Sequence, residues 1–435
     1  MNLQNLSKLF ASHGCSKIYV KRLAPNDNSK NQVYLAGSFD ILNILPISDI
    51  VAEEAGDWEK ERFKAALKFS WIGEDGNLYP APKSQLILYP KYPEVRFSGF
   101  LIKCDNPPSA LMTQRLANRL LFIGVTSNGV VIGYVCAPDS PLAREFENVK
   151  TTSEYGVFTV LELIQTADNK EILLAELLRI HEAGWINSKR LDRSGKIVPC
   201  VSTNCGGYTL EAELGITPNG YSEPDFLGWE IKQFGVTNLE KISSAVITLM
   251  TPEPTHGIYK SEGAEAFIRS YGYADKTGRP DRMNFGGVHR TNSRHSTTNL
   301  EMQLIGFDSE SGKIRNANGS IVLLNKDGNE AASWSFSSLL LHWNRKHNQA
   351  CYVPSLSDVV GSRRYHYGSK VILGTGTDFQ LFLTQMATGN IYYDPGIKME
   401  NMSSKPKIKK RSQFRIKSQH LPMLYKHFEL VDITE

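Results

Sequence analysis

The chain has 435 residues, of which 41% are hydrophobic and 22% are charged, and its formal net charge is +4 at pH 7. This composition excludes an intrinsically disordered protein, and the length predicts two domains or three rather than a single core. The mildly basic charge allows a polyanionic partner without requiring one. No stretch approaches the roughly 18 to 20 apolar residues of a membrane helix, and the start lacks a secretory signal. We therefore expect a cytoplasmic protein with no membrane span.

Short runs of β-branched and aromatic residues dominate the first part of the chain, to about residue 160. Gly, Pro, Asn and Asp separate the runs, which is the pattern of strands joined by turns. The runs are KIYVKRL (17–23), QVYLAG (32–37), LKFSWIG (67–73), QLILYP (85–90), EVRFSGFLI (94–102), RLLFIGVT (119–126) and GVVIGYVCA (129–137). Many short strands at this spacing predict a β-barrel or a β-sandwich.

The pattern changes near residue 160, where FTVLELIQ (158–165) and NKEILLAELLRIHEAGW (169–185) show helical spacing. In the second run, Ile172, Leu173, Leu177 and Ile180 are expected to line one face of a helix. The segment ADNK (167–170) supplies an exposed break and a helix start. We place a domain boundary there, which separates residues 1–165 from residues 166–435. The second part mixes helices and strands.

The six cysteines are scattered, and only Cys200 and Cys205 lie close together in the sequence. No second pair is present to complete a zinc site. Because the cytoplasm disfavours disulfides, we expect these cysteines to be buried or incidental thiols.

The segment PDFLGWEIK (224–232) has the pattern of a β-hairpin with its turn at Leu227-Gly228. In that hairpin Asp225 lies opposite Glu230, and cross-strand Cβ atoms are roughly 4.5 to 5.5 Å apart. Lys232 projects from the same face as Glu230, because side chains two residues apart in a strand share a face. Leu-Gly is not the preferred two-residue turn, so a longer loop with a shifted pairing stays open.

Two opposed carboxylates repel each other unless a proton or a cation lies between them. Hard oxygen ligands suit Mg²⁺, which also takes oxygen from a phosphate, and a neighbouring lysine can orient water or stabilise charge. The pattern thus indicates metal-assisted phosphodiester hydrolysis, with Asp225 and Glu230 as metal ligands. An exposed hairpin with an ordinary charged face is the alternative. The apolar neighbours favour a buried site, since buried strands seldom carry three charges without a purpose. Glu211, in a short helical stretch after Gly206-Gly207, is a further candidate carboxylate.

The order of these residues resembles the catalytic core of the MvaI/BcnI family of restriction endonucleases. GGYTLEAELGI (206–216) is followed by PDFLGWEIK, which matches the family pattern of a helical Glu, then Pro-Asp, then Glu-x-Lys. The resemblance implies an α/β (α+β) PD-(D/E)xK nuclease domain over residues 166–435, related to the nicking enzyme MutH. It also implies Mg²⁺ as cofactor, double-stranded DNA as substrate, a monomer, and a short site with CC and GG flanking its centre. The catalytic residues would be Glu211, Asp225, Glu230 and Lys232.

The N-terminal part is similar to the effector-binding domain of EcoRII-type restriction enzymes, a mostly β, B3-like DNA-binding pseudobarrel. The similarity lies in YVKRLAPNDNSKNQVYL (19–35), and the spacing departs from the EcoRII-type pattern after Asn26. It implies a first DNA-contacting arm with Lys21, Arg22, Asn26 and Asp27. YPKYPEVRFSGF (89–100), with Lys91 and Arg96, is the candidate second arm. Together the two resemblances imply an EcoRII-type domain (1–165) joined to an MvaI-like nuclease (166–435).

Two further basic segments are candidates for DNA contact. KMENMSSKPKIKKRSQFRIK (398–417) is rich in Lys and Arg, and its interleaved apolar residues favour a packed strand over a solvated tail. Arg411 and Arg415 are its candidates for base edges, because Arg reads guanine bidentately. GRPDRMNFGGVHRTNSRH (278–295) is equally consistent with a DNA-clasping loop and with an ordinary surface loop. Its arginines are Arg279, Arg282, Arg290 and Arg294.

The helix expected at HWNRKHN (342–348) faintly resembles a His-Asn-His nuclease motif, but exposed histidines on a helix explain it better. The chain shows no helicase or nucleotide-hydrolysis motif, so cleavage is expected to need no ATP. We interpret the sequence as a site-specific type II restriction endonuclease whose N-terminal domain binds a second copy of the site. A MutH-like repair nickase and a non-catalytic B3-type DNA-binding regulator are the alternatives.

Overall fold

The structure is a computed structural model, and it describes residues 1–25, 32–53, 61–91, 94–126, 128–150, 152–163, 169–202, 204–217 and 225–435. The chain divides into two compact units, Met1–Thr166 and Ala167–Glu435, each with its own sheets and core. Among the helices of the described ranges, none is long and apolar enough to cross a membrane.

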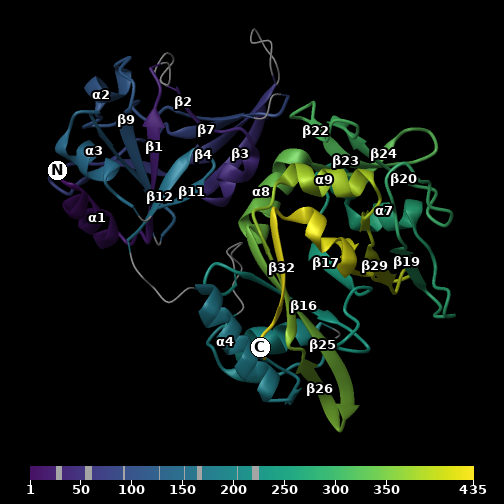
Figure 1. Cartoon of the computed structure of the whole chain (residues 1–435). Coiled ribbons are helices and arrows are strands. Elements are labelled where there is room, and N and C mark those ends of the chain that lie inside the picture. Colours follow the sequence, from purple (N-terminus) through teal and green to yellow (C-terminus); the bar gives the residue numbers. More distant parts are fainter. Residues whose placement is uncertain are drawn as a thin grey trace. The chain divides into compact units, whose positions relative to one another are not determined.

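Two sheets form the first unit (Figure 1). One has the strand order β11-β12-β1-β9-β10-β5-β6, and the other has the order β2-β8-β7-β4-β3. The rings of Phe69 in β5 and Phe97 in β8 meet edge to face with centroids 4.9 Å apart, so apolar side chains join the two sheets. The elements of this unit are α1 (Leu3–Ser12), β1 (Lys17–Leu23), β2 (Gln32–Ala36), η1 (Phe39–Asn43), β3 (Ile47–Glu53), β4 (Arg62–Leu67), β5 (Phe69–Ile72), β6 (Leu78–Pro80), β7 (Gln85–Tyr89), β8 (Glu94–Ser98), α2 (Ser109–Thr113), β9 (Arg119–Val125), β10 (Val131–Cys136), α3 (Pro141–Glu147), β11 (Ser153–Tyr155) and β12 (Phe158–Glu162).

The strands predicted from the β-branched runs of the first unit are confirmed, because β1, β2, β5, β7, β8, β9 and β10 lie within those runs. The helical prediction for FTVLELIQ is wrong over its first five residues. They form β12, which pairs antiparallel with both β1 and β11. The apolar spacing of this segment fits a strand as well as a helix, and pairing with the neighbouring strands selects the strand.

The second unit contains a central sheet with the order β13-β26-β25-β27-β32, and β16 joins it by pairing in parallel with the first half of β25. Smaller sheets surround it, with the orders β17-β31-β28, β18-β19-β29-β30 and β20-β23-β24. The elements up to β24 are α4 (Asn169–Glu182), β13 (Trp185–Asn187), β14 (Lys189–Leu191), β15 (Ile197–Pro199), α5 (Cys205–Glu213), β16 (Glu230–Gly235), β17 (Val246–Met250), α6 (Ile258–Ser261), α7 (Gly263–Tyr271), β18 (Tyr273–Ala274), β19 (Arg282–Gly286), β20 (Glu301–Ile305), β21 (Phe307–Asp308), β22 (Lys313–Ile314), β23 (Ser320–Leu324) and β24 (Glu330–Ser335).

The C-terminal segment completes this unit. Its elements are α8 (Phe336–His347), β25 (Gln349–Val360), β26 (Ser362–Tyr367), β27 (Lys370–Thr375), α9 (Phe379–Ala387), β28 (Ile391–Tyr393), β29 (Gly396–Glu400), β30 (Lys407–Lys409), β31 (Phe414–Lys417), η2 (Ser418–Leu424) and β32 (His427–Asp432). The packed strand predicted within residues 398–417 is confirmed, because Phe414 and Ile416 of β31 are fully buried. The mixed α/β architecture of this unit agrees with the fold class expected from the sequence.

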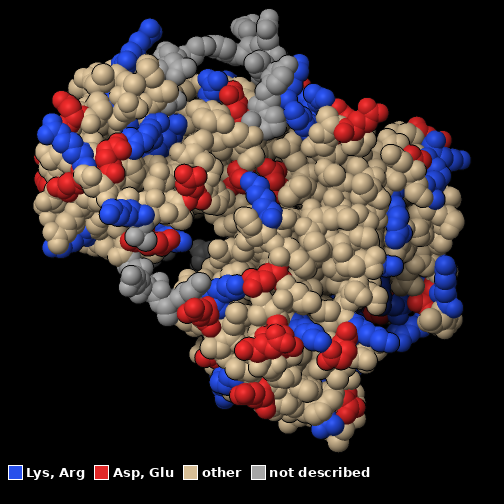
Figure 2. All heavy atoms as spheres, in the orientation of Figure 1, with Lys and Arg blue, Asp and Glu red and all other residues tan. Residues whose placement is uncertain are grey.

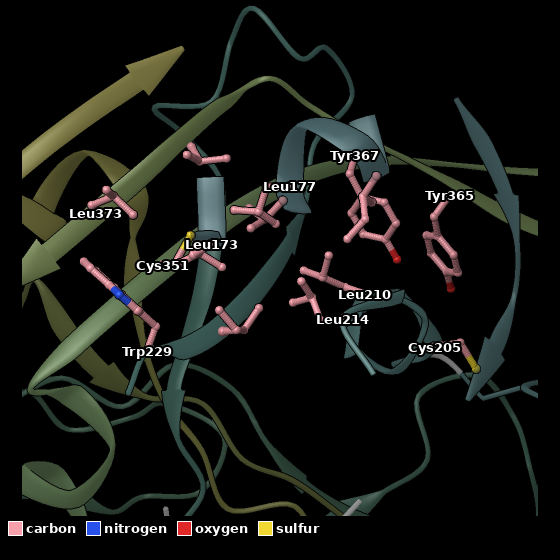
Figure 3. Packing of buried hydrophobic residues seen from close by; sticks show 14 of the residues in the cluster. Leu173, Leu177, Cys205, Leu210, Leu214, Trp229, Cys351, Tyr365, Tyr367 and Leu373 are labelled. Carbon is pink, nitrogen blue, oxygen red and sulfur yellow. The ribbon is translucent and has the colours of Figure 1, made fainter. Parts of the chain in front are cut away.

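The apolar side chains of α4 and α5 pack on one face of the central sheet (Figure 3). Leu173 and Leu177 of α4 and Leu210 of α5 meet Ile231 of β16 and Cys351 of β25 there. Side chains alternate between the faces of a strand, so Glu230 and Lys232, the neighbours of Ile231, point to the opposite face. The core thus decides which side of β16 carries its charges. The predicted α4 face is wrong only at Ile172, which is 36% exposed.

Candidate active site

The tight turn predicted at Leu227-Gly228 is confirmed. The backbone N–H of Phe226 donates to the Trp229 carbonyl at 2.9 Å, and the Trp229 N–H donates back at 2.8 Å. Both central residues have positive φ, 48° at Leu227 and 89° at Gly228, as a type I′ turn requires. Leu disfavours this conformation, so a strained residue lies two positions from Asp225. Beyond the turn, however, β16 pairs with β25 and forms no long hairpin.

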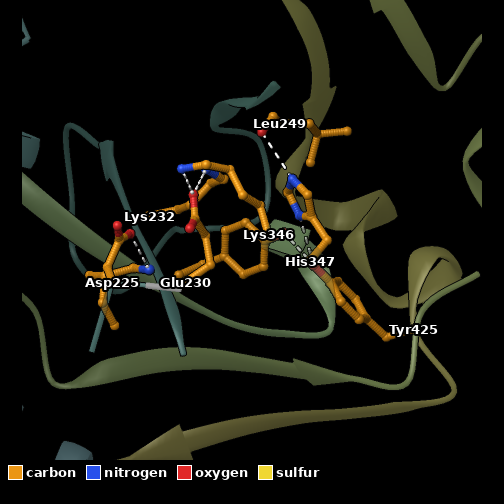
Figure 4. A network of polar contacts seen from close by, with 9 residues as sticks. Asp225, Glu230, Lys232, Leu249, Lys346, His347 and Tyr425 are labelled. Carbon is orange, nitrogen blue, oxygen red and sulfur yellow. Dashed lines mark hydrogen bonds and ion pairs between the residues drawn. The ribbon is translucent and has the colours of Figure 1, made fainter. Parts of the chain in front are cut away.

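Asp225 and Glu230 lie beside one another at the start of β16 (Figure 4). One oxygen of Asp225, Oδ2, accepts a hydrogen bond from the Ile231 N–H at 3.0 Å. Glu230 is only 2% exposed, and its Oε1 contacts Lys232 Nζ at 2.7 Å. Its other oxygen, Oε2, is buried and has no hydrogen-bond partner among the described residues. Each carboxylate thus has one oxygen engaged by the protein.

A second lysine reaches the same carboxylate from a distant part of the chain. Lys346, on α8, places its Nζ 3.4 Å from Glu230 Oε1. The sequence analysis missed this residue, because nothing in HWNRKHN marks the lysine as a neighbour of PDFLGWEIK. The exposed histidines predicted there are also wrong for His347, which is fully buried.

Glu211 lies near this pair on α5. The helix begins at Cys205 and runs through the two glycines, whereas the sequence suggested a start after them. An added Cβ at Gly206 would lie 2.7 Å from Gln233 Oε1 of β16, so the helix packs closely on the strand. Glu213 secures the end of the helix through Lys189 Nζ at 2.5 Å.

Burial, together with the negative charges of Asp225 and Glu230, raises the pKa of Glu211 to about 7. Burial likewise raises the pKa of Asp225 to about 6, together with the charge of Glu230. Lys232 and Lys346 act in the opposite direction on both groups. The acids therefore form one electrostatic cluster, in which full ionisation is costly without a cation.

The residues fit a magnesium ion. Carboxylate oxygens are the ligands that Mg²⁺ prefers, and the bare, buried Oε2 of Glu230 is an acceptor in need of a partner. Among the described residues, no group of three or more His, Cys, Asp or Glu side chains is arranged to hold a metal ion. Two protein carboxylates are sufficient for Mg²⁺ at a phosphate site, since it keeps waters and takes substrate oxygens.

Cys200 and Cys205 form a disulfide, which corrects the expectation of free thiols for this pair. Cys205 is the first residue of α5, so the bond ties the preceding loop to the helix that carries Glu211. The loop brings the two Cα atoms to 5.8 Å, within the range for a disulfide.

The candidate first arm of the N-terminal unit is partly used within the fold. Lys21 is only 7% exposed, and its Nζ lies 5.9 Å from the centre of the Tyr34 ring. Arg22 is exposed and pairs with Glu147 at 2.6 Å. Asn26 and Asp27 lie outside the described residues. Of this set, Arg22 has a guanidinium at the surface.

The two cations of the candidate second arm, Lys91 and Arg96, differ in their exposure. Lys91 is exposed. Arg96 lies over the Tyr89 ring at 5.7 Å and pairs with Glu94 at 3.0 Å.

Of the six candidate arginines in the second unit, four are exposed: Arg279, Arg290, Arg294 and Arg411. Arg290 lies 5.0 Å from the centre of the Tyr392 ring. Three of the six pair with carboxylates: Arg282 with Asp275 and Glu400, Arg294 with Glu301, and Arg415 with Asp394. Figure 2 shows Lys and Arg side chains along the right-hand edge of this unit, over the region that Figure 1 labels β19 and β29.

Comparison with known proteins gives one family match, to the MvaI/BcnI restriction endonuclease family, over residues 174–425. No curated protein matches the chain. The structure of restriction endonuclease MvaI in complex with its cognate DNA substrate aligns with a TM-score of 0.46 and 20% identity, covering 61% of this chain and 99% of that chain. MvaI in the absence of DNA aligns with a TM-score of 0.34 and 19% identity, covering 62% and 99%. Because both TM-scores are low, the assignment rests on the family match.

The raised pKa of Glu211 predicts a pH-dependent difference between the wild type and Glu211→Gln. The pKa of Glu211 is near 4.5 in the unfolded chain, so below that pH the acid is protonated in both states and the protein has its full stability. As the pH rises through about 7, the unfolded chain is ionised more readily than the folded protein, so the free energy of unfolding falls. The variant cannot ionise, so its stability relative to the wild type should increase by about 2 kcal/mol between pH 5 and pH 8.

The measurement is the thermal midpoint of each protein in a chelator at the two pH values. Glu182→Gln, at an exposed position of α4, is the matched control and should show no such difference. A constant offset for Glu211→Gln would mean that Glu211 is ionised throughout.

Proposed function

The chain belongs to the MvaI/BcnI restriction endonuclease family, and on that premise we propose that it is a type II enzyme that hydrolyses double-stranded DNA with Mg²⁺. The observation that supports the proposal best is the carboxylate pair at one turn, Asp225 and Glu230, each with one oxygen engaged and both beside Lys232. Family membership makes the chain a DNA-binding hydrolase of a restriction system. The metal ligands and the catalytic lysine are assigned by this proposal.

In this mechanism Asp225 and Glu230 would hold Mg²⁺, which would supply Lewis-acid activation of the phosphate and of the attacking water. The hydrogen bond from Ile231 N–H to Oδ2 orients the Asp225 carboxylate. Lys232 is held by Glu230 and places a positive charge where negative charge develops on the phosphate. Glu211, with its pKa near 7, exchanges a proton near neutral pH and supports the cluster from α5.

The enzyme acts without ATP and as a monomer in this proposal, at a short site in which CC and GG flank the centre. These features come from the family resemblance of GGYTLEAELGI and PDFLGWEIK. For DNA contact we assign Arg279, Arg290, Arg294, Arg411 and Arg415 in the second unit. Arg282 is left out, because its side chain is buried between Asp275 and Glu400.

We further propose that the first unit is an EcoRII-type, B3-like domain that binds a second copy of the site. Its two-sheet architecture and the exposed Arg22 and Lys91 support this role. Lys21 is left out, because it is buried. When two sites lie on one DNA molecule, binding of one site by the first unit raises the effective concentration of the other site at the second unit. Such a domain can therefore regulate cleavage.

Glu230→Ala and Asp225→Ala should each reduce DNA cleavage by about a thousandfold or more while site-specific binding is retained. The reason is that the pair holds the cation and reads no bases. Cleavage of a supercoiled plasmid with Mg²⁺ measures this, with Asp327→Ala, an exposed acid outside the site, as control. Robust cutting by either variant would remove the assignment. A wild type that stops at open circles would support the MutH-like nickase instead.

A second prediction concerns the first unit. The full chain should cut a two-site plasmid faster than a one-site plasmid, and Lys91→Glu should abolish the difference while one-site cleavage continues. A reversed charge in the proposed arm repels the phosphate backbone. Lys8→Glu, on the exposed side of α1, is the matched control. An equal rate on both plasmids for the wild type would contradict the two-site role.

A further inference from the structure

Lys346 has no role in the proposed chemistry, although it contacts the same carboxylate oxygen as Lys232. Its Nζ lies 3.4 Å from Glu230 Oε1, whereas that of Lys232 lies at 2.7 Å. The side chain of Lys346 is 25% exposed and that of Lys232 is 16% exposed. Lys346 is thus the looser and the more accessible of the two ammonium groups (Figure 4).

His347, the next residue along α8, fixes the position of the helix end that carries Lys346. That imidazole stacks on Trp343 at 4.0 Å and lies 3.1 Å from the Leu249 carbonyl through Nε2. A carbonyl only accepts, so Nε2 carries the proton, and Nδ1 accepts from the Tyr425 hydroxyl at 3.4 Å. Burial lowers the pKa of His347 well below its usual value, so the ring is neutral. The end of α8 is therefore a rigid base for a flexible lysine side chain.

Once a divalent cation is bound, the positive charges of the cluster exceed the negative charges by one, and that one corresponds to Lys346. Glu211, Asp225 and Glu230 supply three negative charges when ionised, and the two lysines supply two positive ones. A divalent cation turns this deficit into a surplus of one positive charge. A phosphodiester carries one negative charge, so the surplus equals what one backbone phosphate brings. Without Lys346 the site with its cation would be neutral before DNA arrives.

A cation on Glu230 also competes with both ammonium groups for that carboxylate, because like charges repel. Lys232 shares the strand and the face of Glu230, so its contact is short and local. Lys346 is attached to a separate helix and is held at a longer distance, so it is the group that exchanges its partner. The nearest anion of matching charge is the DNA backbone.

We propose that Lys346 is a second substrate-contacting lysine, which pairs with Glu230 in the absence of cation and binds a backbone phosphate when cation and DNA are present. This inference rests on the proposed nuclease function and adds a residue to its active site. Within the segment HWNRKHN, His347 anchors the helix and Lys346 binds the phosphate of the substrate.

The test measures the affinity for a duplex containing a site that the wild type cuts, with Ca²⁺ in place of Mg²⁺, across a range of NaCl concentrations. Lys346→Gln should bind roughly tenfold more weakly, and the slope of log affinity against log salt should become shallower by about 0.9, the loss of one phosphate contact. Lys346→Arg should restore the slope. Lys232→Gln removes a partner of the same oxygen and should leave the slope unchanged. Lys170→Gln, which loses its ion pair with Glu429 and no contact with Glu230, is the control.

Thermal midpoints in a chelator accompany each variant, because both Lys346→Gln and Lys232→Gln remove a partner from buried Glu230. If Lys346→Gln loses stability but keeps the wild-type slope, the lysine only neutralises Glu230 and the inference is wrong. An equal change of slope in Lys232→Gln would also overturn it. Failure of the nuclease function is recognised separately, since the wild type would then not cut with Mg²⁺ or Glu230→Ala would still cut.

Discussion

The second unit is organised around the buried carboxylate of Glu230. A charged group that is 2% exposed is unfavourable unless it is paired, and here two ammonium groups share Oε1 while Oε2 lacks a partner among the described residues. The compensating charges come from β16 itself and from α8. Asp225 and Glu211 add two further carboxylates, so the negative charges of the cluster outnumber the positive charges of the two lysines. A cation is the species that such a cluster favours.

Strand β16 separates packing from chemistry through its alternation. Ile231 faces α4 and α5 in the apolar core, and Glu230 and Lys232 face α8. The N–H of Ile231 binds Asp225, so even the backbone contributes to the site. Since Glu230 and Lys232 stand on a paired strand and Glu211 on a packed helix, the core maintains their positions, and the hydrogen bond from Ile231 fixes Asp225 beside them. A site held in this way is more precise than one built on loops.

Burial of the side chain decides which basic residues are available to a polyanion. Arg282 is buried between two acids, whereas Arg279, Arg290 and Arg411 lie at the surface. The same distinction holds in the first unit, where Lys21 is buried and Lys91 is exposed. The fold thus determines which cations of a segment rich in Arg and Lys stabilise the structure and which can contact phosphates. Counting charges along the chain does not make this division.

The sequence by itself determined the features that depend on neighbours in the chain: seven of the twelve strands described in the first unit, the turn at Leu227-Gly228, and the common face of Glu230 and Lys232. Alternation and turn chemistry act over a few residues, so the local pattern was sufficient. Only the tertiary structure decided that Lys346 meets Glu230, that His347 is buried, and that Cys200 and Cys205 are bonded. The disulfide closes a short loop between residues five apart in the sequence, whereas the contacts of Lys346 and His347 arise when distant segments pack together as β25 pairs with β16. Such long-range packing leaves no periodic mark in the sequence.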